Sequence, residues 1–323
     1  MKLKIAAICG GYSSEYVISM KSVETIITNL DNDKYDVYKV KIDQNEWICY
    51  DGNKISEINQ KDFTARDGLL KFDFAFIMIH GTPGEDGKLQ AYFDMLNMPY
   101  STCNHLMSTI TFNKWSCNHL LKSLGFLCPE SMLIRKNQTI DENKIEKKIG
   151  FPMFIKPSDG GSSFGVTKVK KREDIIPAIN KALKEGTEAL IEAFIEGIEL
   201  TCGVYFNGKS TVVLPVTQIM TQNEFFDYNA KYAGESTEET PAKIPDELRD
   251  KLQGIVKNVF ECLGLKGMAR IDFMVKNETP YLIEINTVPG FSPASIVPQQ
   301  IKAFGLSIQQ VLDEIIQAGM QDY

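Results

Sequence analysis

The segment from Lys266 to Gly290, KGMARIDFMVKNETPYLIEINTVPG, constrains the fold of this chain more than any other part of it. Polar and apolar residues alternate along Met268–Lys276 and along Pro280–Thr287, which is typical of β-strands with one buried face. The residues between the two strands, Lys276–Pro280, favour a turn. The segment therefore predicts an antiparallel β-hairpin that folds about Glu278.

The two faces of this hairpin differ in chemistry. A fold about Glu278 places Asp272 opposite Glu284, because paired positions sum to a constant. By the same rule Arg270 lies opposite Asn286. Side chains two residues apart on a strand share a face, so these four polar side chains point to one side of the hairpin. The apolar side chains are expected on the other side: Ile271, Phe273, Ile283 and Ile285.

The polar face indicates a cation site. Two carboxylates directly opposite each other repel by a few tenths to about 1 kcal/mol, so we expect a cation beside Asp272 and Glu284. Carboxylate and amide oxygens, including that of Asn286, are hard ligands of the kind that Mg²⁺ takes, whereas zinc prefers His and Cys. The alternative is a solvated outer face of a sheet that binds nothing.

The N-terminal part of the chain has the pattern of an open α/β sheet. Lys2–Cys9 predicts a buried strand that runs into a glycine turn, a serine cap and an amphipathic helix. Tyr35–Ile42 predicts a second strand, and the almost wholly apolar Phe72–Ile79 predicts a third, central strand. The loop HGTPGEDG at residues 80–87 is then expected at the same edge of the sheet as the first glycine turn.

A second glycine-rich loop lies between strands expected at Phe151–Ile155 and from Val166 onward, in the sequence FPMFIKPSDGGSSFGVTKV. Glycines let backbone N–H groups approach an anion closely, so this loop is expected to cover phosphate as a hairpin. It lacks the Gly-Lys-Ser/Thr triplet of a P-loop. The alternative is a mobile surface turn.

A third notable segment, Thr221–Ala242, has the sequence TQNEFFDYNAKYAGESTEETPA and shows neither helical nor strand period. Its aromatic residues favour a lid over a disordered insert. Helical patterns are expected at 88–96, 113–124, 141–149, 246–263 and 307–318.

Composition excludes several classes of function. With a net charge of −7 and a pI near 5.2, the chain offers no basic stripe for nucleic acid. No stretch approaches the roughly 20 apolar residues of a membrane span. The seven cysteines contain no Cys-x-x-Cys pair and suit reduced thiols. We therefore expect a cytoplasmic protein without nucleic-acid or membrane partners.

Taken in order, the motifs resemble those of the D-alanine–D-alanine ligases of the ATP-grasp superfamily. The resemblance runs from Ile5 to near the C-terminus and rests on GGYSSE, HGTPGEDG, Asn113-Lys114, KPSDGGSSFG, the Glu-rich strand from Glu188, DYNAKY, ARIDFM and EINTVPG. It implies an α/β ATP-grasp fold, with α+β character in the ATP-binding part. It also implies three domains: a Rossmann-like substrate domain at 1–102, a central subdomain at 103–191 and a C-terminal subdomain at 192–323.

The resemblance further implies roles for single residues. ATP would contact Lys114, Lys156, Lys231, Glu192, Ala193, Ile195 and Glu199. Two Mg²⁺ ions, which Mn²⁺ can replace, would be held by Asp272, Glu284 and Asn286. A hydrogen-bonded trio over the substrates would be Glu15, Ser162 and Tyr232. The substrates and the intermediate would contact Arg270, His80, Glu85, Gly290, Ser295 and Ile296.

The implied activity is the ATP-dependent ligation of two D-alanines through an acyl phosphate, for peptidoglycan precursors, by a homodimer. Tyr232 predicts an amine nucleophile, because related ligases that use D-lactate have Phe at the matching position. The chain departs from the usual pattern at Tyr16-Val17, Val288 and Phe291, near the substrates. The alternatives are a D-alanine–D-serine or other amino-acid ligase and a nucleotide-binding protein without activity.

Overall fold

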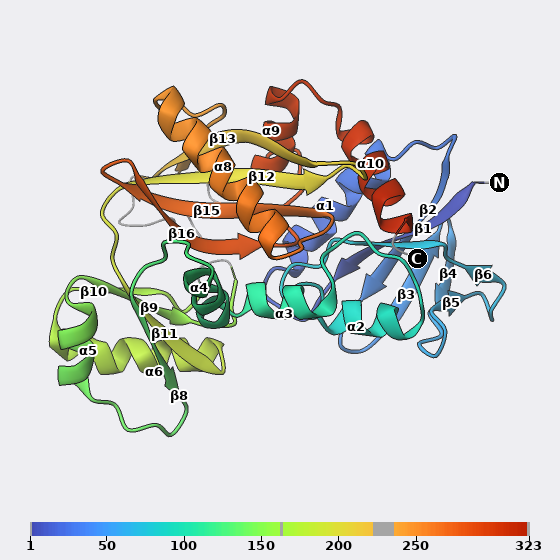
Figure 1. The fold of residues 1–323 in the computed structure, drawn as a ribbon. Coiled ribbons are helices and arrows are strands. Elements are labelled where there is room, and N and C mark those ends of the chain that lie inside the picture. Colours follow the sequence, from blue (N-terminus) through green and yellow to red (C-terminus); the bar gives the residue numbers. More distant parts are fainter. Residues whose placement is uncertain (1, 162–163, 222–235, 322–323) are drawn as a thin grey trace.

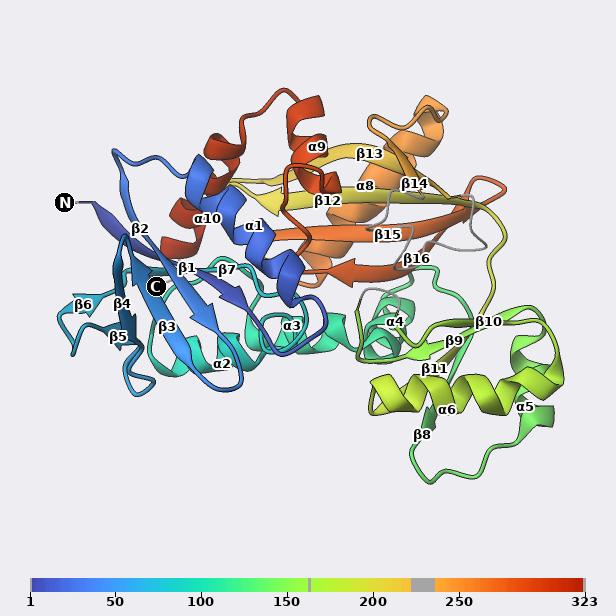
Figure 2. The same cartoon turned by 180° about the vertical axis from the view of Figure 1, so that it is seen from behind.

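The computed structural model describes residues 2–161, 164–221 and 236–321. Three β-sheets of four or five strands follow one another along the described chain, and each is covered by helices (Figures 1 and 2). Both ends of the described chain lie near the first sheet, because the last helix returns to it (Figure 1).

The first sheet has the strand order β4-β3-β2-β1-β7, with β1 parallel to both of its neighbours. Its strands are β1 (Leu3–Gly10), β2 (Tyr35–Ile42), β3 (Trp47–Asp51), β4 (Lys54–Glu57) and β7 (Phe74–Ile77). Helices α1 (Tyr16–Asn29) and α2 (Lys88–Met95) pack beside it, and a small separate ribbon consists of β5 (Thr64–Ala65) and β6 (Leu70–Lys71).

Two expectations for this sheet are wrong. Strand β7 is the last strand in the order rather than a central one. It is buried on both faces because its alternating side chains enter two different hydrophobic clusters, and a single bridge from Ala75 to Tyr100 covers its outer edge. The N-cap of α1 is Glu15 without a side-chain cap, and the Ser13 hydroxyl instead donates to the His80 carbonyl (2.9 Å).

The second sheet is antiparallel with the order β10-β9-β11-β8. Its elements are β8 (Ser131–Arg135), α5 (Glu142–Ile149), β9 (Met153–Pro157), β10 (Thr167–Val169), a 3₁₀ turn (Arg172–Asp174), α6 (Ile175–Glu185) and β11 (Glu188–Ala193). Helix α6 covers one face through a separate hydrophobic cluster. The glycine-rich loop does return as a strand, as predicted.

The third sheet, with the order β14-β13-β12-β15-β16, carries the predicted hairpin at its edge. Its strands are β12 (Ile198–Phe206), β13 (Thr211–Thr221), β14 (Ser236–Glu239), β15 (Met268–Lys276) and β16 (Thr279–Asn286). The surrounding helices are α3 (His105–Phe112), α4 (Lys114–Ser123), α8 (Asp246–Cys262), α9 (Ile296–Ala303) and α10 (Ile308–Met320). Strand β14 falls in the segment expected to lack a strand period, and most of that segment lies outside the described residues.

The predicted hairpin register is confirmed: Asp272 pairs with Glu284. The turn differs from a fold about Glu278, because Asn277 and Glu278 form a two-residue turn with φ of 48° and 58°. A regular ladder continued from that turn would place Asp272 opposite Ile283.

A β-bulge after Leu282 restores the register. Ile283 is the extra residue on β16, so Glu284 and Asn286 reach their predicted partners. The expectation that Ile283 packs in the core is wrong: it is half-buried, and Leu282 fills the core position opposite Phe273. The bulge therefore keeps both carboxylates on the polar face.

The first and third sheets share one hydrophobic cluster. It joins β1, β7 and α1 to α9, α10 and the loop after β16. At its margin the Tyr205 hydroxyl donates to Glu314 (2.7 Å). The shared core brings the loops of the first sheet against the hairpin of the third. No helix within the described residues is long and apolar enough to span a membrane.

Candidate active site

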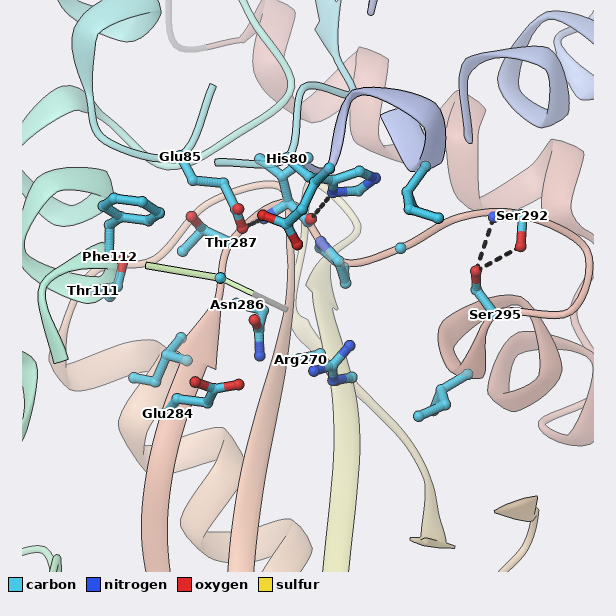
Figure 3. A pocket seen from close by; sticks show the side chains of 18 of the residues that line it. His80, Glu85, Thr111, Phe112, Arg270, Glu284, Asn286, Thr287, Ser292 and Ser295 are labelled. Atoms are coloured by element: carbon cyan, nitrogen blue, oxygen red, sulfur yellow. Dashed lines mark hydrogen bonds between the residues drawn. The ribbon is translucent and has the colours of Figure 1, made fainter. Parts of the chain in front are cut away.

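A pocket of about 310 Å³ opens where the first sheet's loops meet the hairpin β15–β16 and the start of α9 (Figure 3). Ten of the sequence-predicted site residues line it: Glu15, His80, Glu85, Lys114, Arg270, Glu284, Asn286, Gly290, Ser295 and Ile296. They come from segments far apart in the chain. The pocket volume is at the lower end of the range for small-molecule sites, about 300–1,000 Å³.

Arg270 neutralises the first carboxylate of the hairpin. Its guanidinium makes two contacts with Asp272, Nε to Oδ1 at 2.8 Å and Nη2 to Oδ2 at 2.6 Å. The Asn286 amide donates to the same Oδ2 (3.0 Å), and the Thr201 hydroxyl donates to Oδ1. Asp272 is buried, and these donors hold it in one orientation.

Lys114 neutralises the second carboxylate and links it to the glycine-rich loop. Its Nζ lies 3.3 Å from Glu284 Oε2 and donates to the Gly160 carbonyl oxygen (2.7 Å). Burial opposes a charge on Lys114, but the carboxylates around it, Glu284 above all, outweigh burial and raise its pKa. The lysine therefore stays cationic in the pocket wall.

A cation is expected beside Asp272 and Glu284. Arg270 lies beside Asp272 and Lys114 lies beside Glu284, so both carboxylates have a protein cation as a neighbour. Among residues 2–161, 164–221 and 236–321, no three His, Cys, Asp or Glu side chains are grouped as a metal site. The grouping of Asp272, Glu284 and Asn286 contains two carboxylates and one amide. Its oxygen donors have the chemistry that Mg²⁺ takes, so the donor set fits a magnesium ion.

His80 is buried and uses both ring nitrogens. Nδ1 lies 2.8 Å from the Val288 carbonyl oxygen, and Nε2 lies 3.0 Å from Ser22 Oγ, which accepts from the Phe291 N–H (3.1 Å). A carbonyl only accepts, so Nδ1 carries the proton and Nε2 accepts from Ser22. Burial lowers the pKa of His80, which keeps the ring neutral.

Glu85 holds the same loop from the other side. Its carboxylate accepts from the Gly81 N–H (2.7 Å) and from the Val288 N–H (3.3 Å). Burial, together with the nearby Glu15 carboxylate, raises the pKa of Glu85 to about 8. Glu15 also lies against the glycine-rich loop, because a Cβ on Gly161 would collide with its carboxylate. Two acidic residues thus share this end of the pocket.

The opposite wall is the entrance to α9. Ser295 is the N-cap of this helix, and its Oγ accepts from the Ser292 N–H (3.0 Å) and lies 2.8 Å from Ser292 Oγ (Figure 3). Gly290 and Ile296 line the same wall. The backbone N–H groups of Ile296 and Val297 at the start of this helix favour an anion, such as a substrate carboxylate, whereas Pro298 has no N–H.

A further group of predicted residues lies apart from this pocket. Lys156 and Glu192 form a buried ion pair between β9 and β11 (2.7 Å), and the Asn118 amide donates to Glu192 (3.0 Å). Ala193 and Ile195 lie at and just beyond the end of β11, and Glu199 lies on β12. None of the five predicted residues among them lines the pocket of Figure 3.

Comparison with known proteins decides the family. A model of the D-ala D-ala ligase N-terminus matches residues 4–103, and a model of the D-ala D-ala ligase C-terminus matches residues 120–317. The chain belongs to the D-alanine–D-alanine ligase family. The ligase is 46% identical to D-alanine–D-alanine ligase of Phocaeicola vulgatus, over 98% of this chain and 99% of the relative. It is 47% identical to that of Bacteroides thetaiotaomicron, with the same coverage.

Solved structures match the ligase along 99% of its length. VanG D-Ala:D-Ser ligase from Enterococcus faecalis is 30% identical with a TM-score of 0.89 and is covered completely. D-alanine–D-alanine ligase from Bacillus anthracis complexed with ATP is 29% identical with a TM-score of 0.81, and 98% of that chain is covered. The ligase thus has the predicted α/β ATP-grasp fold, and it belongs to an ATP-dependent family.

Three predicted site residues, Ser162, Lys231 and Tyr232, lie outside the described part of the ligase. Sequence reasoning missed three others that the structure brings to the site: Ser22, Thr201 and Glu238. Ser22 had a signal, since it falls on the inward face of α1, where a buried hydroxyl needs a partner. Glu238 had no such signal in the sequence, because its segment showed no strand period.

Proposed function

We propose that the ligase uses ATP to join two D-alanines into D-alanyl-D-alanine, with ADP and phosphate as the other products, for peptidoglycan precursors. The observation that carries the proposal is the bridge made by Lys114. One ammonium group contacts both the Gly160 carbonyl of the glycine-rich loop and the Glu284 carboxylate of the hairpin. A cation between a phosphate-type loop and an acidic edge suits phosphoryl transfer.

The reaction begins with a carboxylate, which is a poor acyl donor. Transfer of the γ-phosphoryl group of ATP to the carboxylate of the first D-alanine gives an acyl phosphate. The ammonium group of the second D-alanine then loses a proton, and the free amine attacks the acyl carbon. The C–N bond forms, the C–O bond to the phosphoryl group breaks, and phosphate leaves with a proton from the nitrogen. Lys114, Lys156 and Lys231 would neutralise phosphate charge, and Arg270 would stabilise the tetrahedral oxyanion.

Asp272, Glu284 and Asn286 would hold two Mg²⁺ ions, or Mn²⁺ in their place, through their oxygen atoms. A bound divalent ion would neutralise charge on the transferring phosphoryl group. Asp272 accepts from Thr201 and Asn286, and Glu284 is paired with Lys114. Binding of a metal ion would require Arg270 and Lys114 to give up some of their contacts with these carboxylate oxygens.

The remaining predicted residues take their places around these groups. Glu192, Ala193, Ile195 and Glu199 would surround adenine and ribose, at the junction of the second and third sheets. Glu15, Ser162 and Tyr232 would tie the first domain, the glycine-rich loop and the lid together. His80, Glu85, Gly290, Ser295 and Ile296 would shape the amino-acid site. The acyl phosphate needs protection from water, which the lid would supply.

D-serine is the second candidate nucleophile, because the VanG D-Ala:D-Ser ligase shares the fold at a TM-score of 0.89. Identity favours D-alanine: the chain is 46–47% identical to D-alanine–D-alanine ligases and 30% identical to VanG. The predicted homodimer and the domain limits at residues 102 and 191 belong to the same proposal. Sedimentation equilibrium and limited proteolysis would check them.

The experiment is a product analysis with matched variants. Wild-type ligase is incubated with ATP, Mg²⁺ and D-alanine, D-serine or D-lactate, and products are identified by mass spectrometry while ADP release is followed. We expect D-alanyl-D-alanine as the main product, and a loss on the order of 10²-fold in kcat for Lys114→Gln. Lys122→Gln, in the last turn of the same helix, is the control, because Lys122 does not line the pocket and pairs with Glu130 (3.2 Å) instead. Absence of dipeptide from the wild type would overturn the proposal.

A further inference from the structure

Glu238 is an acidic residue of the pocket wall that the predicted site does not include. It lies on the edge strand β14, where it pairs with Ile219 of β13. Its side chain lines the same pocket as Arg270, Ser295 and Ile296. Its neighbour Glu239 does not line the pocket and forms an ion pair with Lys243. The two adjacent carboxylates therefore face different surroundings.

A hydrogen bond from α9 holds Glu238 in place. Gln299 Nε2 donates to Glu238 Oε2 (2.9 Å) and also to the Ala294 carbonyl oxygen (2.9 Å). Within residues 2–161, 164–221 and 236–321, Gln299 is the hydrogen-bond partner found for this carboxylate. The carboxylate is thus tied to the helix whose first residues form the anion-favouring wall of the pocket.

Within the described part of the chain, the surroundings of Glu238 supply little positive charge. Burial raises its pKa, and the opposing effects of the Gln299 hydrogen bond and the Arg270 charge are smaller. Arg270 gives two contacts to Asp272, which limits what it offers Glu238. A cationic ligand group in the pocket would compensate for the lost hydration of the carboxylate.

The other acidic side chains of the pocket are engaged elsewhere. Glu284 is paired with Lys114, and Glu85 accepts from two backbone N–H groups. Glu15 lies at the opposite side, against Gly161 of the glycine-rich loop. On the α9 side of the pocket, the carboxylate of Glu238 is therefore the group suited to a ligand cation, with Arg270 as the nearby cation for a ligand anion.

We propose that Glu238 is a specificity-determining residue that binds the ammonium group of the second amino acid, whose carboxylate faces Arg270 and the start of α9. Positive and negative groups placed together in this way complement a zwitterionic α-amino acid. A 2-hydroxy acid has no ammonium group, so nothing in it would compensate for the lost hydration of the half-buried Glu238 carboxylate. This inference rests on the proposed ligation of two D-alanines and adds how the second one is recognised.

The test compares two isosteric variants on one strand, Glu238→Gln and Glu239→Gln. Loss of a charge-assisted hydrogen bond predicts that Glu238→Gln raises the KM for the second D-alanine about tenfold, with the KM for ATP within about twofold of wild type. In competition between D-alanine and D-lactate near neutral pH, the ratio of dipeptide to depsipeptide should fall about tenfold. Glu239→Gln should leave both quantities unchanged.

A second variant separates substrate binding from support of α9. Gln299→Met removes the hydrogen bond but keeps the charge of Glu238, so the product ratio should stay within about threefold of wild type. If Gln299→Met changed the product ratio as much as Glu238→Gln does, the role of Glu238 would be to hold α9 in place, and the inference would be overturned. An unchanged KM and product ratio in Glu238→Gln, with dipeptide still formed by the wild type, would also overturn it. A wild type without dipeptide would instead refute the proposed function.

Discussion

His80 Nδ1 lies 2.8 Å from the carbonyl oxygen of Val288, a residue 208 positions later in the chain. This hydrogen bond joins the loop after β7 to the loop after β16. The Glu85 carboxylate accepts a hydrogen bond from the N–H of the same Val288 (3.3 Å). One residue of the hairpin's exit is thus held by two side chains of the first sheet. Since both ring nitrogens of His80 are engaged, the imidazole positions the pocket wall rather than moving protons.

Glu85 makes stability depend on pH with a known sign. Its folded-state pKa of about 8 exceeds the ordinary glutamate value of 4.5, so unfolding releases a proton between these two pH values, and stability falls as pH rises through that window. The melting temperature of wild type minus that of Glu85→Gln should therefore be larger at pH 5 than at pH 8. Glu57→Gln, exposed on β4, is the control and should show no such trend. A larger difference at pH 8 would contradict the assignment.

Glu284→Gln should reduce turnover on the order of 10²-fold or more, because it removes a carboxylate proposed to bind Mg²⁺ and the partner of Lys114. The Mg²⁺ concentration for half-maximal activity should rise as well. Glu278→Gln at the far end of the hairpin, outside the pocket, is the control. Steady-state kinetics over a Mg²⁺ series measures both effects. Unaltered kinetics in Glu284→Gln would remove the metal assignment.

Gly161→Ala should lower activity far more than stability. A methyl group there would overlap the Glu15 carboxylate and push the glycine-rich loop away from the first sheet. Gly160→Ala is the matched control: among the described residues its methyl group would meet Pro157, with Cβ at 3.1 Å, and the substitution should cost less activity. Kinetics and melting curves of the two variants check the order. Equal activity of both would show that the loop does not need this close approach.

Glu278→Gly should stabilise the hairpin. Glu278 has a φ of 58°, and an L-residue in this left-handed region is strained by roughly 1 kcal/mol, which glycine avoids. The greater freedom of glycine in the unfolded chain offsets part of the gain, so we expect an increase of about 0.5 kcal/mol in unfolding free energy. Chemical denaturation measures it. Destabilisation would mean that the Glu278 side chain makes a contact that outweighs the backbone strain.

Local sequence patterns predicted much of the fold. The strand at Tyr35–Ile42 has the predicted limits, and the alternation in Met268–Lys276 predicted one buried face. Periodicity failed at β7, where apolar residues on both faces suggested a central strand. Strand β7 lies at the edge of its sheet, and two hydrophobic clusters bury its two faces. Periodicity shows that both faces of a strand are buried, but it does not show whether the strand is central or at an edge.

The candidate site divides in the same way. The sequence by itself determined which residues carry charge and which of them share a face, because a strand has a period of two and paired positions are set by a turn. Only the tertiary structure decided that a bulge at Ile283 restores the pairing, that Val288 is held by His80, and that Glu238 reaches the pocket. The bulge lies within the hairpin, but periodicity does not reveal an extra residue in a strand. The other two contacts depend on segments distant in sequence that are brought together by the burial of a common core, and no local pattern encodes such a contact.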